Sequence, residues 1–135
     1  GNAMAVQGGG QILNVASVAA FQPGPWMSSY AASKAYVLHF SEGLREELKQ
    51  TGVKVSVLCP GPVRSSQRRI PRLANSSQVL DPEQVALQTV RALARNRAVI
   101  VPGQRNAWLA RAPRLGSRWL TRIVSGWINK AFAPH

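Results

Sequence analysis

Hydrophobic and polar positions follow two different periods along the chain, and these predict strands and helices in alternation. Residues 11–17 form an apolar, β-branched run after several glycines, which is typical of a buried strand. Between 28 and 50 the apolar residues recur near a helical period, and 53–63 returns to an apolar, β-branched run. A strand, a helix and a strand of these lengths predict a βαβ unit, with parallel strands and a right-handed crossover.

Residues at the ends of these segments support the assignment. Ser28 or Ser29 can cap the start of the first helix, and Gly52 stands where a left-handed residue ends one. Asp81 can cap a second helix that is expected to reach residue 96. The long polar segment between the second strand and this helix is expected to be a loop, either a functional lid or disordered.

The last third of the chain predicts one more strand and a helical tail. A short apolar run at 98–103 predicts the third strand, and 105–135 reads as one or two short helices interrupted near Pro113. In this tail an apolar stripe and a basic stripe run side by side at four-residue spacing, so the tail is amphipathic and basic. The apolar stripe comprises Leu115, Trp119, Ile123, Trp127 and Ala131, and the basic stripe comprises Arg114, Arg118 and Arg122.

Composition adds limits to this picture. The chain has 135 residues, 45% hydrophobic and 16% charged, which fits one globular domain and a cytoplasmic, soluble protein. Its one cysteine, Cys59, excludes an internal disulfide and is expected to be a buried strand residue, the alternative being a nucleophile. The two histidines, His39 and His135, lie far apart, so no metal site is expected.

The net charge of +12 is distributed unevenly. Residues 1–60 contain four basic and three acidic side chains, whereas 61–135 contain thirteen basic and two acidic ones. Such a bias can attract nucleic acid or anionic lipid, or can simply keep a protein in solution. Nucleic-acid binding is the weakest of these interpretations, because no nucleic-acid module surrounds the basic residues.

Tyr30 and Lys34 are the first candidates for chemistry. They stand four apart in the predicted helix, in the run "YAASK", so both side chains lie on one helix face. A neighbouring ammonium stabilises a phenolate, which suits a general acid or base. Ser17 ends the first strand, at the edge where open α/β sheets bind ligands, and its hydroxyl can meet the phenol over a carbonyl substrate. The alternatives are a solvated helix face for the pair and a plain strand-end hydroxyl for Ser17.

Other residues leave two interpretations open. Phe21, Trp26 and Met27 either wall a substrate pocket or pack in the core. A set of arginines in the long loop either meets an anionic substrate or cofactor phosphate or lies on a solvated lid. This set comprises Arg64, Arg68, Arg69 and Arg72.

Three motifs in register resemble the short-chain dehydrogenase/reductase family. "NVAS", then "YAASK" thirteen positions on, then "VSVLCPGPVRS" reproduce that family's Ser, Tyr-x-x-x-Lys and Pro-Gly-x-Val-x-Thr motifs. The resemblance covers about residues 8–103. It implies a Rossmann fold, a nicotinamide cofactor, NADP or NAD, and hydride transfer to or from a ketone or secondary alcohol. Extended relatives that epimerise or dehydrate nucleotide sugars also use Tyr-x-x-x-Lys, but the "PGPV" segment favours the dehydrogenase type.

The resemblance also implies roles for single residues. Tyr30 would exchange a proton with the substrate oxygen, and Lys34 would assist it and hold the nicotinamide ribose. Ser17 would hydrogen-bond the substrate oxygen. The residues expected to line the nicotinamide, besides Tyr30 and Lys34, are Pro60, Gly61, Val63 and Ser65, the last of which replaces the family's usual Thr.

Two features of the family pattern are missing from the sequence. There is no Gly-rich strand-to-helix turn for the phosphates, because the glycines of "GNAMAVQGGGQ" are consecutive and precede a strand. The family's relay Asn would lie farther upstream of Ser17 than Asn2 does. The chain is therefore expected to be the C-terminal half of such a fold, inactive alone, and unstable or associating through the open edge of the 11–17 strand.

The sequence thus predicts an α/β fold, the C-terminal half of a Rossmann-type parallel sheet with three strands and crossover helices. Residues 1–104 are expected to form the partial catalytic domain and 105–135 the basic tail. The expected partners are a small ketone or alcohol, with lipophilic ones among the candidates, and, for the full-length form, further copies in a homo-oligomer. No nucleic acid is expected. The tail is expected either to pack on the domain or on another subunit, or to contact a membrane peripherally. The alternative function is a non-catalytic fragment that associates through this tail.

Overall fold

A three-stranded parallel sheet forms the centre of the computed structural model, which describes residues 1–64, 79–111 and 117–130. The strands are β1 (Gly10–Val15), β2 (Val53–Leu58) and β3 (Val99–Ile100), in the order β1-β2-β3. Gly10 pairs with Val53 and Val15 with Leu58, while Val57 and Leu58 pair with β3. The parallel sheet is as predicted, but β1 ends two residues earlier than expected and β3 contains two residues instead of six.

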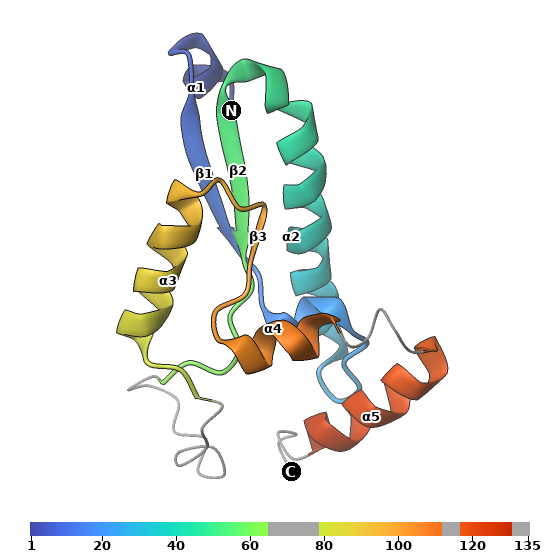
Figure 1. Cartoon of the computed structure of the whole chain (residues 1–135). Helices are drawn as coiled ribbons and strands as arrows, with labels where there is room; N and C mark the ends of the chain where they lie inside the picture. The colour runs from blue at the N-terminus through green and yellow to red at the C-terminus, as the bar shows by residue number, and fades with distance from the viewer. Residues whose placement is uncertain (65–78, 112–116, 131–135) are drawn as a thin grey trace.

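One long helix covers each face of this sheet. Helix α2 (Ser28–Glu47) runs along one face and α3 (Pro82–Ala94) lies against the other, as Figure 1 shows. The short 3-10 helix η2 (Lys49–Thr51) follows α2, and Gly52, with φ of 75°, turns the chain back into β2. This left-handed turn at Gly52 was predicted, since only glycine adopts the conformation without strain.

The helix starts agree with the sequence at α3 and differ at α2. Asp81 caps α3 as predicted, with its carboxylate accepting from the backbone N–H of Glu83 at 3.4 Å. The expected cap by Ser28 or Ser29 is wrong: Met27 occupies the N-cap position and makes no side-chain cap hydrogen bond. The Ser28 hydroxyl instead donates to the carbonyl of Gly24 at 3.2 Å, because Ser28 already lies inside the first turn.

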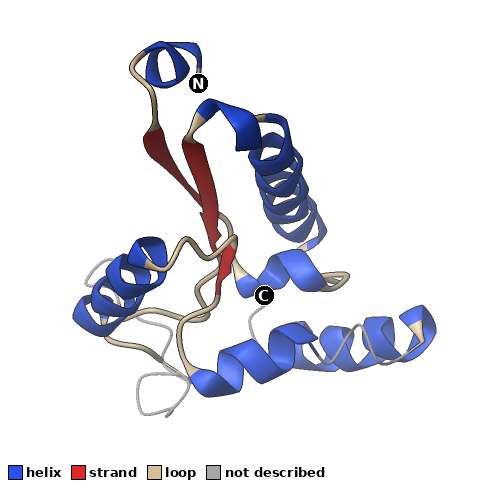
Figure 2. Cartoon of the chain, turned by 45° about the horizontal axis from the view of Figure 1, so that its top comes forward, coloured by secondary structure: helices blue, strands red, loops and turns tan. Residues whose placement is uncertain are grey.

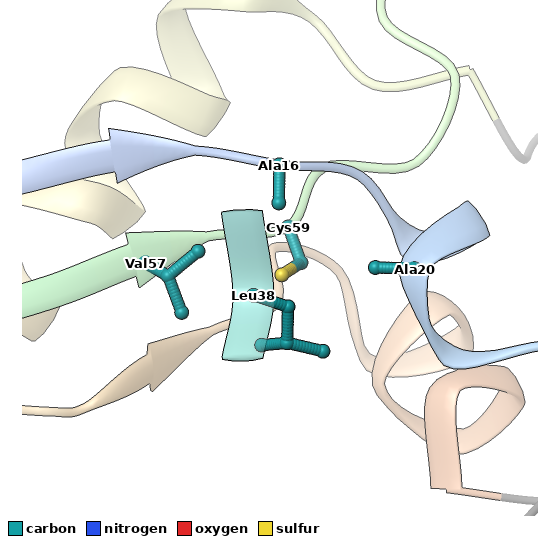
Figure 3. Close-up of a cluster of buried hydrophobic side chains, with 5 residues drawn as sticks. All are labelled: Ala16, Ala20, Leu38, Val57 and Cys59. Atoms are coloured by element: carbon teal, nitrogen blue, oxygen red, sulfur yellow. The ribbon is translucent and has the colours of Figure 1, made fainter. Parts of the chain in front are cut away.

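The core consists of two clusters, one on each face of the sheet. The cluster between α2 and the sheet comprises Ala16, Ala20, Leu38, Val57 and Cys59, drawn in Figure 3. The cluster under α3 comprises Leu58, Val85 and Ile100. Burial of apolar surface in these two layers is the main stabilising term of the fold.

Strand β1 lies at the edge of the sheet, and only one of its faces is covered. Asn14 faces α2, where its amide donates to the hydroxyl of Ser41 at 2.9 Å. Leu13 and Val15 point the other way and are 37% and 52% exposed. The open edge agrees with the sequence, and association through it stays a prediction.

The remaining helices lie at the two ends of the sheet. Helix α1 (Asn2–Val6) precedes β1 and was not predicted from the sequence. The 3-10 helix η1 (Val18–Phe21), α4 (Gln104–Arg111) and α5 (Arg118–Lys130) lie beyond the carboxyl ends of the strands, as Figures 1 and 2 show. The described part of the tail therefore contains two helices, while the expected interruption at Pro113 falls outside the described residues.

Candidate active site

Ser17 stands two residues after the end of β1, at the carboxyl edge of the sheet. It caps η1, since its hydroxyl accepts from the backbone N–H of Ala19 at 3.2 Å. The same hydroxyl donates to the carbonyl of Pro60, at the end of β2, across 3.5 Å. This second contact is at the long limit of a hydrogen bond, so a better acceptor can draw the hydroxyl proton away from Pro60.

Tyr30 and Lys34 lie in the first turns of α2 and share a face, as their spacing predicts. The ammonium nitrogen of Lys34 lies 5.8 Å from the centre of the Tyr30 ring. It also donates to the carbonyl of Val15, the last residue of β1, at 3.2 Å. The Tyr30 side chain is 42% exposed and thus open to a bound molecule.

These contacts gather the candidate groups at one edge of the sheet. Ser17 reaches Pro60, so the carboxyl ends of β1 and β2 meet there, and Lys34 is attached to the end of β1. The crevice outside the carboxyl ends of parallel strands is the place where open α/β sheets bind ligands. The arrangement offers a hydroxyl, a phenol and an ammonium in one region, which suits proton transfer to or from an oxygen atom.

The segment after β2 is held from two sides. Val63 forms a parallel bridge with Leu80, and the Arg64 N–H donates to the Leu80 carbonyl at 2.9 Å. Gly61 lies so close to the Asn106 carboxamide that a Cβ at this position would overlap it. Ser65, together with Arg68, Arg69 and Arg72, lies outside the described residues.

Asn106 is a residue that sequence reasoning missed. It lies in α4, is 6% exposed, and donates through its amide nitrogen to the carbonyl of Pro102 at 3.2 Å. Its carboxamide thereby fills the space next to Gly61 and limits the positions that the Pro60 and Gly61 backbone can take. A single asparagine in the polar part of a basic helix gives no pattern that could have revealed this contact.

Cys59 belongs to the core and not to the site. Its side chain is fully buried in the cluster of Figure 3. Burial raises the pKa of its thiol from 9.0 to about 11, a backbone hydrogen bond at Ser17 lowers it in part, and the charge of Glu42 raises it further. The thiol therefore stays protonated and behaves as a small apolar side chain, as predicted.

A groove lies on the side of α2 away from the pair of Tyr30 and Lys34. Its volume is about 740 Å³, and its walls come from η1, the following proline-rich loop, α2 and α5. Phe21 lines this groove and also packs against the core cluster, so its expected core packing is confirmed, while its part in a substrate pocket stays a prediction. Trp26 is 64% exposed and is not among the lining residues.

The described part of the chain contains neither a metal-ligand cluster nor a membrane-spanning helix. Across residues 1–64, 79–111 and 117–130, no three side chains of the metal-ligating types come together. None of the helices in these ranges has the length and apolar content needed to cross a membrane.

Comparison with known proteins shows to which family the chain belongs. The model of the family described as short chain dehydrogenase matches residues 2–74, which is more than half of the chain and includes Ser17, Tyr30, Lys34 and the Pro60 segment. The chain therefore belongs to the short-chain dehydrogenase/reductase family, as the three motifs predicted.

Individual relatives agree with this assignment. The ketoacyl reductase HetN of Nostoc sp. is 34% identical over 107 residues, which cover 75% of this chain and 36% of HetN. A short-chain dehydrogenase of Sphingobium yanoikuyae, solved in complex with NADPH, has a TM-score of 0.69 and 28% identity, covering 84% of this chain and 44% of that one. A 7β-hydroxysteroid dehydrogenase structure has a TM-score of 0.75 and 25% identity, covering 93% and 49%. The chain thus spans about half or less of the length of these relatives.

Proposed function

We propose that the protein is an NAD(P)-dependent oxidoreductase that interconverts a ketone and a secondary alcohol. The observation that carries this proposal is the meeting of Ser17, the pair of Tyr30 and Lys34, and Pro60 at the carboxyl edge of β1 and β2. Family membership supports it, because these residues match the family's motifs in order and spacing.

In this proposal each side chain has one task. The Tyr30 hydroxyl gives its proton to the substrate oxygen in reduction and takes it back in oxidation. The Ser17 hydroxyl turns from the Pro60 carbonyl to the same oxygen and stabilises the negative charge that develops on it. The Lys34 ammonium, held by the Val15 carbonyl, keeps a positive charge near the phenol, where negative charge develops during proton transfer.

The nicotinamide, when bound, supplies or accepts the hydride. The donor set at the sheet edge fits its ribose end, because the Lys34 ammonium has three N–H donors, one of which donates to the Val15 carbonyl. The family pattern assigns Pro60, Gly61, Val63 and Ser65 to the nicotinamide side. The 135 residues contain no Gly-rich turn between a strand and a helix, so we propose no phosphate contacts and expect the isolated polypeptide to be inactive.

The names of the relatives support the choice of substrate class and cofactor. HetN is named a ketoacyl reductase, and a structural neighbour is a hydroxysteroid dehydrogenase; both names indicate a carbonyl or a secondary alcohol as the reacting group. The Sphingobium enzyme was solved with NADPH, which favours NADP over NAD here. On the basis of the names ketoacyl reductase and hydroxysteroid dehydrogenase, we propose a lipophilic ketone or alcohol as substrate.

The test uses the protein made from the complete reading frame that contains these residues. We expect it to oxidise NADPH in the presence of a ketone from a panel of aliphatic, aromatic and polycyclic ketones. Tyr30→Phe should abolish turnover and Ser17→Ala should lower kcat about a hundredfold, which is typical for a lost oxyanion donor. Tyr36→Phe, on the exposed outer face of the same helix, is the matched control and should keep full activity. Turnover that survives in Tyr30→Phe would refute the proposal.

A further inference from the structure

Helix α5 packs against the domain with its small and polar side chains. Ser125 is 1% exposed, and its hydroxyl donates to the Thr121 carbonyl within the helix at 2.6 Å. Gly126 faces the proline-rich loop, where the position of a Cβ would lie 3.6 Å from the ring of Pro25. Thr121 and Arg122 line the groove between α5 and the domain. The inward face of this amphipathic helix is thus its polar one.

The apolar face of α5 points away from the domain. Five large apolar side chains are exposed by 38–83%, and Trp127 is the most exposed of them. At about 100° per residue they occupy one continuous arc of roughly 140° of the helix surface. One interpretation of the apolar stripe was packing against the domain of the same chain. This interpretation is wrong for Trp119 and Trp127, because both side chains are exposed. The five residues, named here the outer face of α5, are Trp119, Leu120, Ile123, Val124 and Trp127.

Charge indicates what can cover this outer face. Residues 104–135 contain six basic side chains and no acidic one. A second copy of the same helix would bring two strongly basic segments together, which is unfavourable. An anionic surface attracts the segment and accepts its apolar side chains, which a polyanion such as nucleic acid does not. The six residues are Arg105, Arg111, Arg114, Arg118, Arg122 and Lys130.

We propose that α5 is a membrane-surface helix, with its outer face inserted between the headgroups of an anionic bilayer. With 13 residues it is too short to cross the bilayer and would lie in the plane of its surface. Trp119 and Trp127 belong to the residue type that prefers the boundary between headgroups and hydrocarbon, because the indole is apolar with one polar N–H. The exposed Lys130 side chain can reach lipid phosphates. This property goes beyond the proposed activity and does not depend on it.

The test is flotation of the complete protein with vesicles of phosphatidylcholine, with and without phosphatidylserine. We expect flotation with the anionic vesicles, weakening as salt is added, and little with phosphatidylcholine alone. The pair of substitutions Trp119→Ser and Trp127→Ser should lower the partition coefficient at least tenfold. Lys130→Gln should lower it about fivefold.

Tyr36→Ser is the control, because Tyr36 is an aromatic residue of similar exposure, 69%, on α2. It should float like the unaltered protein. Far-UV circular dichroism of each variant should be unchanged, since all the substituted side chains are exposed. Absent flotation with anionic vesicles would overturn the proposal, and so would flotation that the two serine substitutions leave unchanged. A dimer that dissociates in the serine variant, without any change in flotation, would assign the outer face to a second copy instead.

Discussion

Arg45 in α2 is predicted to contribute more to stability than any ordinary surface arginine. Its guanidinium donates to the carbonyl of Val55 in β2 at 2.5 Å. It also donates to the backbone carbonyl and the side-chain oxygen of Asn96, each at 3.0 Å. Strand β3 begins only at Val99, so it has no residue that hydrogen-bonds the Val55 carbonyl. The Arg45 guanidinium makes this hydrogen bond instead. One side chain thus joins a helix, a strand and the turn that leads into the third strand.

The magnitude follows from these contacts. Hydrogen bonds to a charged group contribute about 1.5–3 kcal/mol, and a buried carbonyl left without a partner costs about 1–3 kcal/mol. Val55 is fully buried, so water cannot replace Arg45 without opening the sheet. We expect Arg45→Met, which keeps the aliphatic stem, to lower the free energy of unfolding by about 3 kcal/mol.

The assay is urea unfolding followed by circular dichroism. Lys54→Met, an exposed position on β2, is the matched control and should change stability by less than about 0.5 kcal/mol. Asn96→Gly keeps the left-handed backbone, with φ of 52°, and removes only the side-chain acceptor, so it should cost about 1 kcal/mol. In combination with Arg45→Met it should cost less than the sum. An Arg45→Met protein as stable as the control would refute the reasoning.

Three further predictions concern the core, the segment after β2 and the open face of β1. The pKa of Cys59 is raised to about 11, so the stability that its protonated form provides is complete below pH 9 and is lost as the pH rises towards 11. Urea unfolding should show this loss as a fall in the free energy of unfolding of up to about 1.4 kcal/mol per pH unit. Cys59→Ala should remove this pH dependence. Gly61→Ala should lower the unfolding midpoint because its Cβ displaces the Asn106 carboxamide, and adding Asn106→Ala should restore part of the loss; an additive double variant would contradict the contact. Leu13→Lys on the open face of β1 should reduce self-association in sedimentation velocity, and an unchanged distribution would show that this face is not involved.

Much of the site could be predicted from the sequence because its residues are placed by patterns between positions close together in the chain. Tyr30 and Lys34 meet through helical spacing, and Ser17 is placed by the end of an apolar strand. The parallel order of β1 and β2 follows from the helix between them, since a parallel connection needs a crossover. These features depend on residues close in sequence or on rules of chain connection.

Other features depend on contacts between distant segments and left no local pattern. The buried Asn106 acquires its role only because α4 folds back onto Gly61, 45 positions earlier in the chain. The sequence pattern identified the stripe of α5 but not its direction, because period alone does not say which face meets the domain. Strand β3 begins only at Val99, and Arg45 contacts Val55 and Asn96 in the place where earlier residues of β3 would pair. The helix α1 lies in a segment whose glycines suggested only a loop.

The most direct test of the central claim is the fate of the hydride. The complete protein would be incubated with a ketone and NADPH that carries deuterium at the transferable C4 position, and the alcohol product analysed by mass spectrometry. The account predicts one deuterium on the carbinol carbon, and no labelled product with Tyr30→Phe. An alcohol without deuterium, or labelled alcohol formed equally well by Tyr30→Phe, would contradict it.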